Sequence, residues 1–141
     1  MASAFDFRNP IVPIRIMLGL LFIPHILFKL NDIPGSTAFF AKVGLQPAGA
    51  ILWLGIAMES LSAICLVFGI LPKWTGFLAS AVMCTAIFAV VQLKGAVWLW
   101  NFGGIEYNVA WAALCATVAI YAWADEKARY GRNFLLFPQA A

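Results

Sequence analysis

Four long apolar runs constrain the fold of this chain more than any other feature of its sequence. They cover approximately residues 10–30, 48–71, 74–93 and 105–124. A helix rises about 1.5 Å per residue and a bilayer core is about 30 Å thick, so about 20 apolar residues can cross it. A helix also satisfies its own backbone polar groups, which lipid cannot do. The runs therefore predict an all-α membrane protein, a bundle of four transmembrane helices.

The composition agrees with lipid as the main solvent. The 141 residues are 64% hydrophobic and 11% charged, whereas soluble domains carry about 25% charged residues. We expect a single domain over residues 1–141, with the lipid bilayer as its first partner. The net charge of +3 comes without any dense run of Lys and Arg. The sequence therefore gives no reason to expect nucleic-acid binding.

The breaks between the runs predict how the helices connect. The break over residues 31–47 is long for so small a bundle, and Ser36 can cap a short helix there. We expect that helix to lie in the membrane interface between spans one and two. The break at Leu71-Pro72-Lys73 is very short, so the second and third runs should form an antiparallel hairpin.

The distribution of Lys and Arg predicts the orientation. With four spans, the N-terminal tail, the second break and the C-terminal tail share one side of the membrane. That side holds Arg8, Arg15, Lys73, Lys127, Arg129 and Arg132. The other side holds Lys29, Lys42 and Lys94. Under the positive-inside rule, both termini are cytoplasmic in a multi-pass protein of the bacterial inner membrane.

Small residues recur at one-turn spacing in the spans. Examples are Gly76, Ser80 and Cys84 in the third run. Gly55 likewise precedes Glu59 by one turn in the second. Such stripes are typical of close helix contacts in membranes, so we expect both to be packing surfaces.

Ionisable side chains inside the apolar runs are the candidate functional residues. A charge at the bilayer centre costs about 2.5–3.5 kcal/mol, so it is expected to have a partner. Glu59 lies eleven residues into the second run, about 16 Å deep at helical rise. Arg15 lies one turn inside the first run, and we expect a structural ion pair between Arg15 and Glu59.

Further polar and aromatic residues gather near the outer ends of the spans. The residues proposed for a ligand pocket are His25, Lys29, Glu59, Glu106, Asn101 and Trp98. Two interpretations stay open. The cluster is a polar pocket that opens outward between Trp98 and Trp100, or it is an internal salt-bridge lattice that fixes the helix register.

No residue pattern predicts catalysis by the chain alone. His25 is the only histidine, and no further ligands are spaced for zinc. The three cysteines lie inside apolar runs without a C-x-x-C pair. No nucleophile motif, P-loop or dinucleotide fingerprint is present. We predict no catalytic residue, no metal and no intrinsic cofactor, and leave open whether the chain is part of an enzyme.

Several of these residues follow one another in a familiar order. They are Arg15, His25, Lys29, the stretch 39–47, Glu59, Gly69 and Phe102-Gly103-Gly104-Ile105-Glu106-Tyr107. In order and spacing they resemble the DoxX family of four-helix membrane proteins, and Gly-Gly-x-Glu-Tyr is the most specific piece. Two positions depart from the family: Ile26 replaces a frequent glycine, and residues 123–127 replace a frequent Ser-Leu-Asp ending.

The resemblance implies a subunit of quinone-linked membrane redox chemistry, since some family members are subunits of a thiosulfate:quinone oxidoreductase. It implies that His25 or Lys29 donates to a quinone carbonyl and that Glu59 or Glu106 relays protons. Other membrane or membrane-associated redox subunits, or a second copy of the chain, would be the partners. Two alternatives remain: a non-catalytic anchor or assembly subunit, and a small transporter or lipid-binding protein.

Overall fold

The computed structural model describes residues 4–137, and within them every regular element is a helix. The elements are α1 (Ile11–Asn31), α2 (Ile33–Lys42), α3 (Ala48–Phe68), α4 (Pro72–Lys94), the short 3-10 helix η1 (Trp100–Phe102) and α5 (Glu106–Tyr130). The helices α1, α3, α4 and α5 are long and apolar enough to cross a membrane. The predicted fold class, an all-α bundle of four membrane spans, is confirmed.

The ends of the spans follow from local chemistry. α3 ends at Phe68 because Gly69 adopts a left-handed conformation (φ 70°) and its N–H returns to the carbonyl of Cys65. Pro72 then begins α4, where a missing N–H costs nothing. α5 runs on to Tyr130, six residues beyond the predicted span, and the ion pair of Asp125 with Arg129 supports its polar last turns.

The short helix between the first two spans begins earlier than predicted. α2 starts at Ile33, and only Asp32 separates it from the end of α1. Asp32 caps it, since its carboxylate accepts a hydrogen bond from the N–H of Gly35 at 2.9 Å. Ser36 is buried within the first turns of the helix. The prediction of Ser36 as the cap is therefore wrong, because a better acceptor lies four residues earlier.

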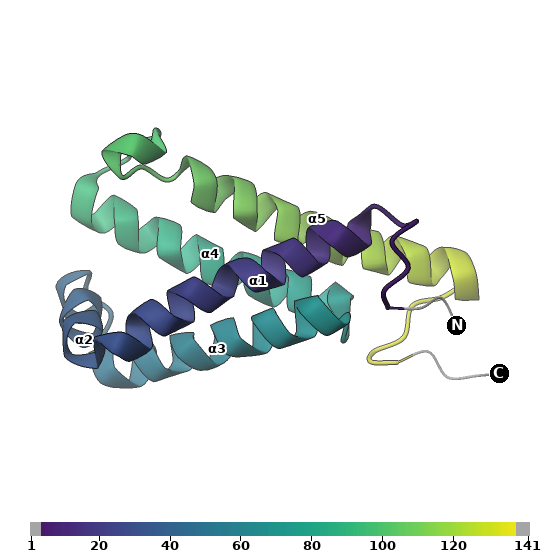
Figure 1. Cartoon of the computed structure of the whole chain (residues 1–141), viewed down its shortest axis with the longest axis horizontal. Coiled ribbons are helices and arrows are strands. Elements are labelled where there is room, and N and C mark those ends of the chain that lie inside the picture. The colour runs from purple at the N-terminus through teal and green to yellow at the C-terminus, as the bar shows by residue number, and fades with distance from the viewer. Residues whose placement is uncertain (1–3, 138–141) are drawn as a thin grey trace.

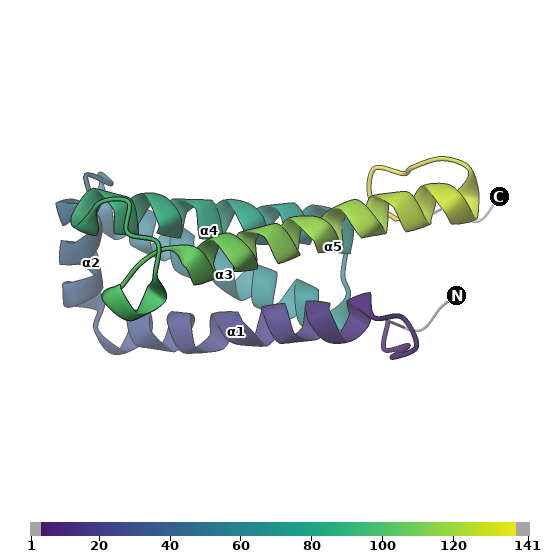
Figure 2. The ribbon, with the colours of Figure 1, turned by 90° about the horizontal axis from the view of Figure 1, so that it is seen from above.

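The four spans form two closely packed pairs. α1 packs along α3, and α4 packs along α5 (Figures 1 and 2). The pairs diverge toward the end of the bundle that carries α2, which we call the α2 end. The start of α1 and the end of α5 both lie at the opposite end (Figure 1), as an even number of spans requires. The assignment of that end to the cytoplasm stays a prediction from the charge count.

Two glycines allow the pairs to pack so closely. A Cβ on Gly19 would lie 2.9 Å from the carbonyl oxygen of Ala63 across α1 and α3. A Cβ on Gly76 would lie 2.6 Å from the carbonyl oxygen of Cys115 across α4 and α5. Backbones can approach this far only where the side chain is absent, which stabilises helix pairs in lipid. The predicted packing role of Gly76 is confirmed.

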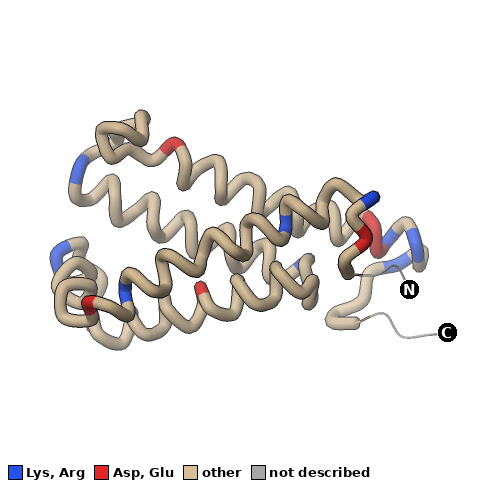
Figure 3. The backbone as a smooth tube through the Cα atoms, viewed as in Figure 1, with Lys and Arg blue, Asp and Glu red and all other residues tan. Residues whose placement is uncertain are grey.

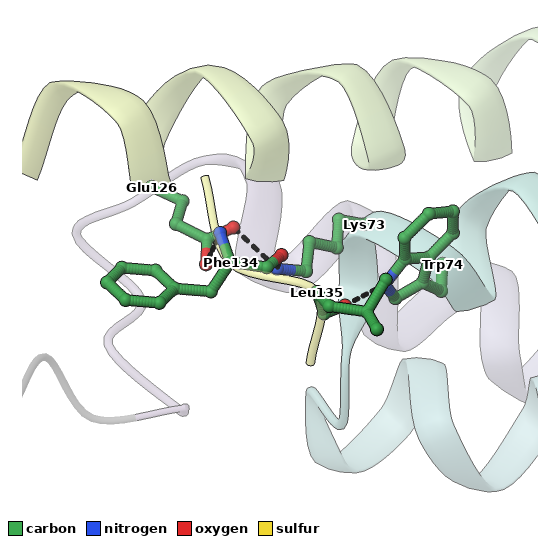
Figure 4. Close-up of polar contacts among 5 residues, drawn as sticks. All are labelled: Lys73, Trp74, Glu126, Phe134 and Leu135. Carbon is green, nitrogen blue, oxygen red and sulfur yellow. Dashed lines mark hydrogen bonds and ion pairs between the residues drawn. The ribbon is translucent and has the colours of Figure 1, made fainter. Parts of the chain in front are cut away.

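Charged residues gather toward the ends of the bundle and are sparse along its middle (Figure 3). At the end opposite α2, Lys73 Nζ lies 2.9 and 2.6 Å from the two carboxylate oxygens of Glu126, and both residues are buried. Lys73 also donates to the carbonyl of Phe134 at 2.5 Å, and Trp74 Nε1 donates to that of Leu135 at 2.6 Å (Figure 4). The segment after α5 therefore folds back onto the start of α4.

We expect Lys73→Met to lower the free energy of unfolding by about 3–5 kcal/mol, because it leaves the Glu126 carboxylate buried without a counter-charge. Asp125→Asn is the matched control, since it breaks an exposed pair with Arg129 worth about 0.3–0.5 kcal/mol. SDS-induced unfolding in mixed micelles, followed by circular dichroism, measures both. Equal and small effects would contradict a stabilising role of the buried pair.

Candidate functional site

A cavity of about 530 Å³ lies between the diverging helix pairs near the α2 end. We call it the α2-side cavity. Residues of all five α-helices and of the loop before α5 line it. Its polar lining residues are His25, Lys29, Glu59, Thr85, Tyr107 and Asn108. The remaining lining is apolar or glycine, so the site combines a few polar groups with a mostly hydrocarbon wall.

An ion pair joins α1 and α3 in this cavity. Lys29 Nζ lies 2.6 and 2.8 Å from the two carboxylate oxygens of Glu59. The side chains are 16% and 8% exposed, respectively. Lys29 lies near the end of α1, and its long side chain reaches toward the middle of α3. The pair neutralises a carboxylate that lipid would otherwise exclude.

The predicted ion pair of Arg15 with Glu59 is wrong. Arg15 lies fourteen residues before Lys29 on α1, about 21 Å along the helix axis. Its guanidinium donates to the carbonyls of Leu66 and Val67, at 3.0 Å for Val67. It also donates to the carbonyl of Ala4 at 2.6 Å. The last carbonyls of a helix lack partners within it and carry partial negative charge, so the end of α3 attracts Arg15 more directly than Glu59 does.

Aromatic rings surround His25. Its Nε2 lies 3.4 Å from the Tyr107 hydroxyl. The ring of Trp111 is centred 5.4 Å from that of His25 and 4.6 Å from that of Phe22. Phe22 and Trp111 belong to the buried core. The imidazole therefore sits where the core ends and the cavity begins.

The cavity has a polar closed end, where it meets the core, and an aromatic end at α2. On α3, Glu59 is the lining residue farthest from α2 along the helix. On α4 that position belongs to Val82, which is part of the core. Phe39 and Phe40 of α2 line the other end. A molecule in the cavity would thus meet Glu59 at one end and aromatic rings at the other.

Three of the six residues proposed for the pocket line this cavity: His25, Lys29 and Glu59. The other three, Glu106, Asn101 and Trp98, lie outside its lining. Asn101 and Trp98 are exposed, and the carbonyl of Trp98 accepts the N–H of Glu106 at 3.0 Å. A backbone hydrogen bond holds this part of the loop, and the side chains of Asn101 and Trp98 lie outside the cavity. Ligand binding by the first three stays a prediction.

Sequence reasoning missed Tyr107 and Asn108, which take the place expected for Glu106. Successive side chains of a helix point about 100° apart. Which of several adjacent residues at the start of a helix faces inward therefore depends on how the helix is rotated about its axis. Asn108 is 5% exposed, and an amide within an apolar run was a signal for it. Phe39 and Phe40 carried no such signal, because their role depends on where α2 docks.

Within residues 4–137, no three His, Cys, Asp or Glu side chains come together in a way that could hold a metal ion. The polar groups of the cavity can instead donate and accept hydrogen bonds. Lys29 Nζ has three donor hydrogens, two of which face Glu59. The arrangement suits an uncharged polar group attached to an apolar body.

Comparison with family models matches residues 11–92 to the DoxX model. The matched range contains α1, α2 and α3 and nearly all of α4. Comparison with curated proteins and with solved structures finds no match.

We expect an asymmetric loss of stability when the Lys29–Glu59 pair is broken. Lys29→Met leaves a carboxylate unpaired near mid-span and should cost about 3–5 kcal/mol. Glu59→Gln should cost less, about 1–3 kcal/mol, because the freed Lys29 ammonium can extend toward the interface.

The double variant Lys29→Met/Glu59→Gln should be no less stable than Lys29→Met. Unfolding in mixed micelles measures the four proteins as a double-mutant cycle. Lys94→Met, at an exposed last-turn lysine of α4, is the control and should change little. Strictly additive losses would show that the two side chains do not interact.

Proposed function

The chain belongs to the DoxX family of membrane proteins, and from this premise we propose that it binds a quinone in the α2-side cavity as the membrane subunit of a redox system. One observation carries the proposal. A mostly apolar cavity of about 530 Å³ ends at a neutralised Lys29–Glu59 pair beside His25 and Tyr107. Its volume lies within the range of about 300–1,000 Å³ typical of small-molecule sites.

The charge balance of the cavity favours a neutral ligand. Lys29 and Glu59 are its charged lining residues, and they cancel each other. An anionic ligand would have to compete with Glu59 for Lys29, and a cationic one with Lys29 for Glu59. A quinone has uncharged carbonyl acceptors and an apolar ring and tail, which match these two kinds of wall.

Hydrogen bonds to the quinone carbonyl would come from the closed end. The third N–H of Lys29, a ring N–H of His25 or the hydroxyl of Tyr107 can donate. Reduction of a quinone to a quinol takes up two electrons and two protons. The electrons would come from a partner protein with its own electron carrier, and Glu59 is the acidic group at the cavity through which protons would pass.

We also propose that the protein lies in the bacterial inner membrane with both termini cytoplasmic. The α2 end would then face the periplasm. A redox partner would supply electrons at that end, where the cavity lies.

We expect the purified protein in nanodiscs to bind a decyl-tailed benzoquinone. Tryptophan fluorescence should report it, since Trp100 lines the cavity and Trp111 adjoins His25. His25→Ala should weaken binding about tenfold, the loss of roughly one hydrogen bond. Glu59→Gln should weaken it by a similar factor, because Lys29 loses the carboxylate that holds its ammonium at the cavity.

Glu106→Gln is the matched control. It removes an acidic residue near the α2 end that lies outside the cavity lining, and binding should be unchanged. If the wild-type protein binds no quinone, or if all three variants bind equally well, the proposal is wrong.

A further inference from the structure

A buried amide on α5 lines the α2-side cavity without a partner in the protein. Asn108 is 5% exposed, and within residues 4–137 its side chain makes no hydrogen bond. Trp111, three residues later on α5, already belongs to the core, so Asn108 lies where the cavity meets the core. Leaving a buried polar group unpaired costs free energy. A ligand with a matching polar group would remove that cost.

The wall that α4 and α5 contribute to the cavity offers hydrogen-bond acceptors. Asn108 Oδ1 is an acceptor beside the donor NH₂ group of the same amide. Thr85 of α4 also lines the cavity, and its hydroxyl donates to the carbonyl of Ala81 at 3.1 Å. Because that bond uses the hydroxyl hydrogen, Thr85 can only accept a hydrogen bond from a ligand.

We propose that Asn108 makes the cavity bind a quinol more tightly than the corresponding quinone. The inference rests on the proposed function and adds which redox form the site favours. Donors on Lys29, His25 and Tyr107 serve both forms, because a phenolic oxygen accepts hydrogen bonds as a carbonyl oxygen does. Acceptors distinguish the two forms, because only the quinol has O–H groups to donate. A quinone leaves Asn108 Oδ1 buried and unpaired, whereas a quinol hydroxyl pairs with it.

Tighter binding of the quinol assists the proposed reduction. The bound quinone takes up two electrons and two protons, and each carbonyl oxygen becomes a hydroxyl. Because the reduced form is bound more tightly, the bound couple has a higher reduction potential than the free couple. The difference is about 30 mV for a tenfold ratio of the two affinities. The partner protein would therefore reduce quinone in the cavity more readily than quinone in the lipid.

The test compares the decyl-tailed benzoquinone with its chemically reduced quinol. Isothermal titration calorimetry without oxygen, on protein in nanodiscs and with empty nanodiscs subtracted, measures both affinities. The wild-type protein should bind the quinol about tenfold more tightly, the effect of roughly one hydrogen bond. Asn108→Leu removes the amide at similar size. It should reduce this ratio to about twofold or less, while affinity for the quinone stays within about threefold of wild type.

Two further measurements separate this role from a structural one. Asn108→Leu should not lower the free energy of unfolding, because the amide has no partner in the protein to lose, whereas loss of a structural amide would lower it. Asn101→Leu is the matched control, since Asn101 is an exposed asparagine of η1 outside the cavity lining. It should keep the wild-type ratio of affinities.

The outcomes separate the two proposals. If the wild-type protein binds neither form, the proposed function fails, and this inference fails with it. If it binds the quinone at least as tightly as the quinol, only the preference is overturned. If Asn108→Leu keeps the wild-type ratio, or Asn101→Leu loses it equally, the role of Asn108 is overturned. Asn108→Ala replaces an Asn108→Leu protein that does not fold; a ratio of about twofold or less supports the role, and an unchanged ratio overturns it.

Discussion

A carboxylate near the middle of a membrane span is the constraint on which the interior of this protein depends. Glu59 cannot face lipid as a bare charge, so α3 has to turn it toward a cation. Lys29 supplies the cation from α1. The close approach of these two helices at Gly19 keeps them together along their length. The pair therefore joins two spans and also fixes where the polar end of the cavity lies.

The two ends of the bundle accommodate their charged side chains in different ways. At the end opposite α2, Arg15 binds the last carbonyls of α3 and that of Ala4, and Lys73 pairs with Glu126 and donates to the carbonyl of Phe134 in the folded-back C-terminal segment. The hydrogen-bonding groups of these cations are used within the protein. At the α2 end the helix pairs diverge, and polar groups remain along a cavity. One end thus uses its cations for contacts within the protein, and the other leaves polar side chains along a cavity.

The four spans could be predicted because lipid imposes their length and apolarity, residue by residue. That Glu59 needs a partner was equally predictable from the cost of its charge. The identity of the partner was not predictable. Residue spacing gives the positions of Cα atoms along the helices, whereas the long side chain of Lys29 extends well beyond its own Cα atom. Gly55 and Gly76 show the same limit. Both fit a small-residue stripe, but an added Cβ would collide with backbone at Gly76 and would make only an ordinary contact with Phe40 at Gly55.

The family match covers part of the cavity lining. Residues 11–92 include the Lys29–Glu59 ion pair and Phe40 of α2, which all line the cavity. Tyr107 and Asn108 come from α5, beyond the matched range. The matched range therefore contains the ion pair of the cavity, and the last span adds a phenol and an amide to its lining. Since the Tyr107 hydroxyl lies 3.4 Å from His25 Nε2, the last span contributes to the hydrogen bonding of the only histidine in the chain.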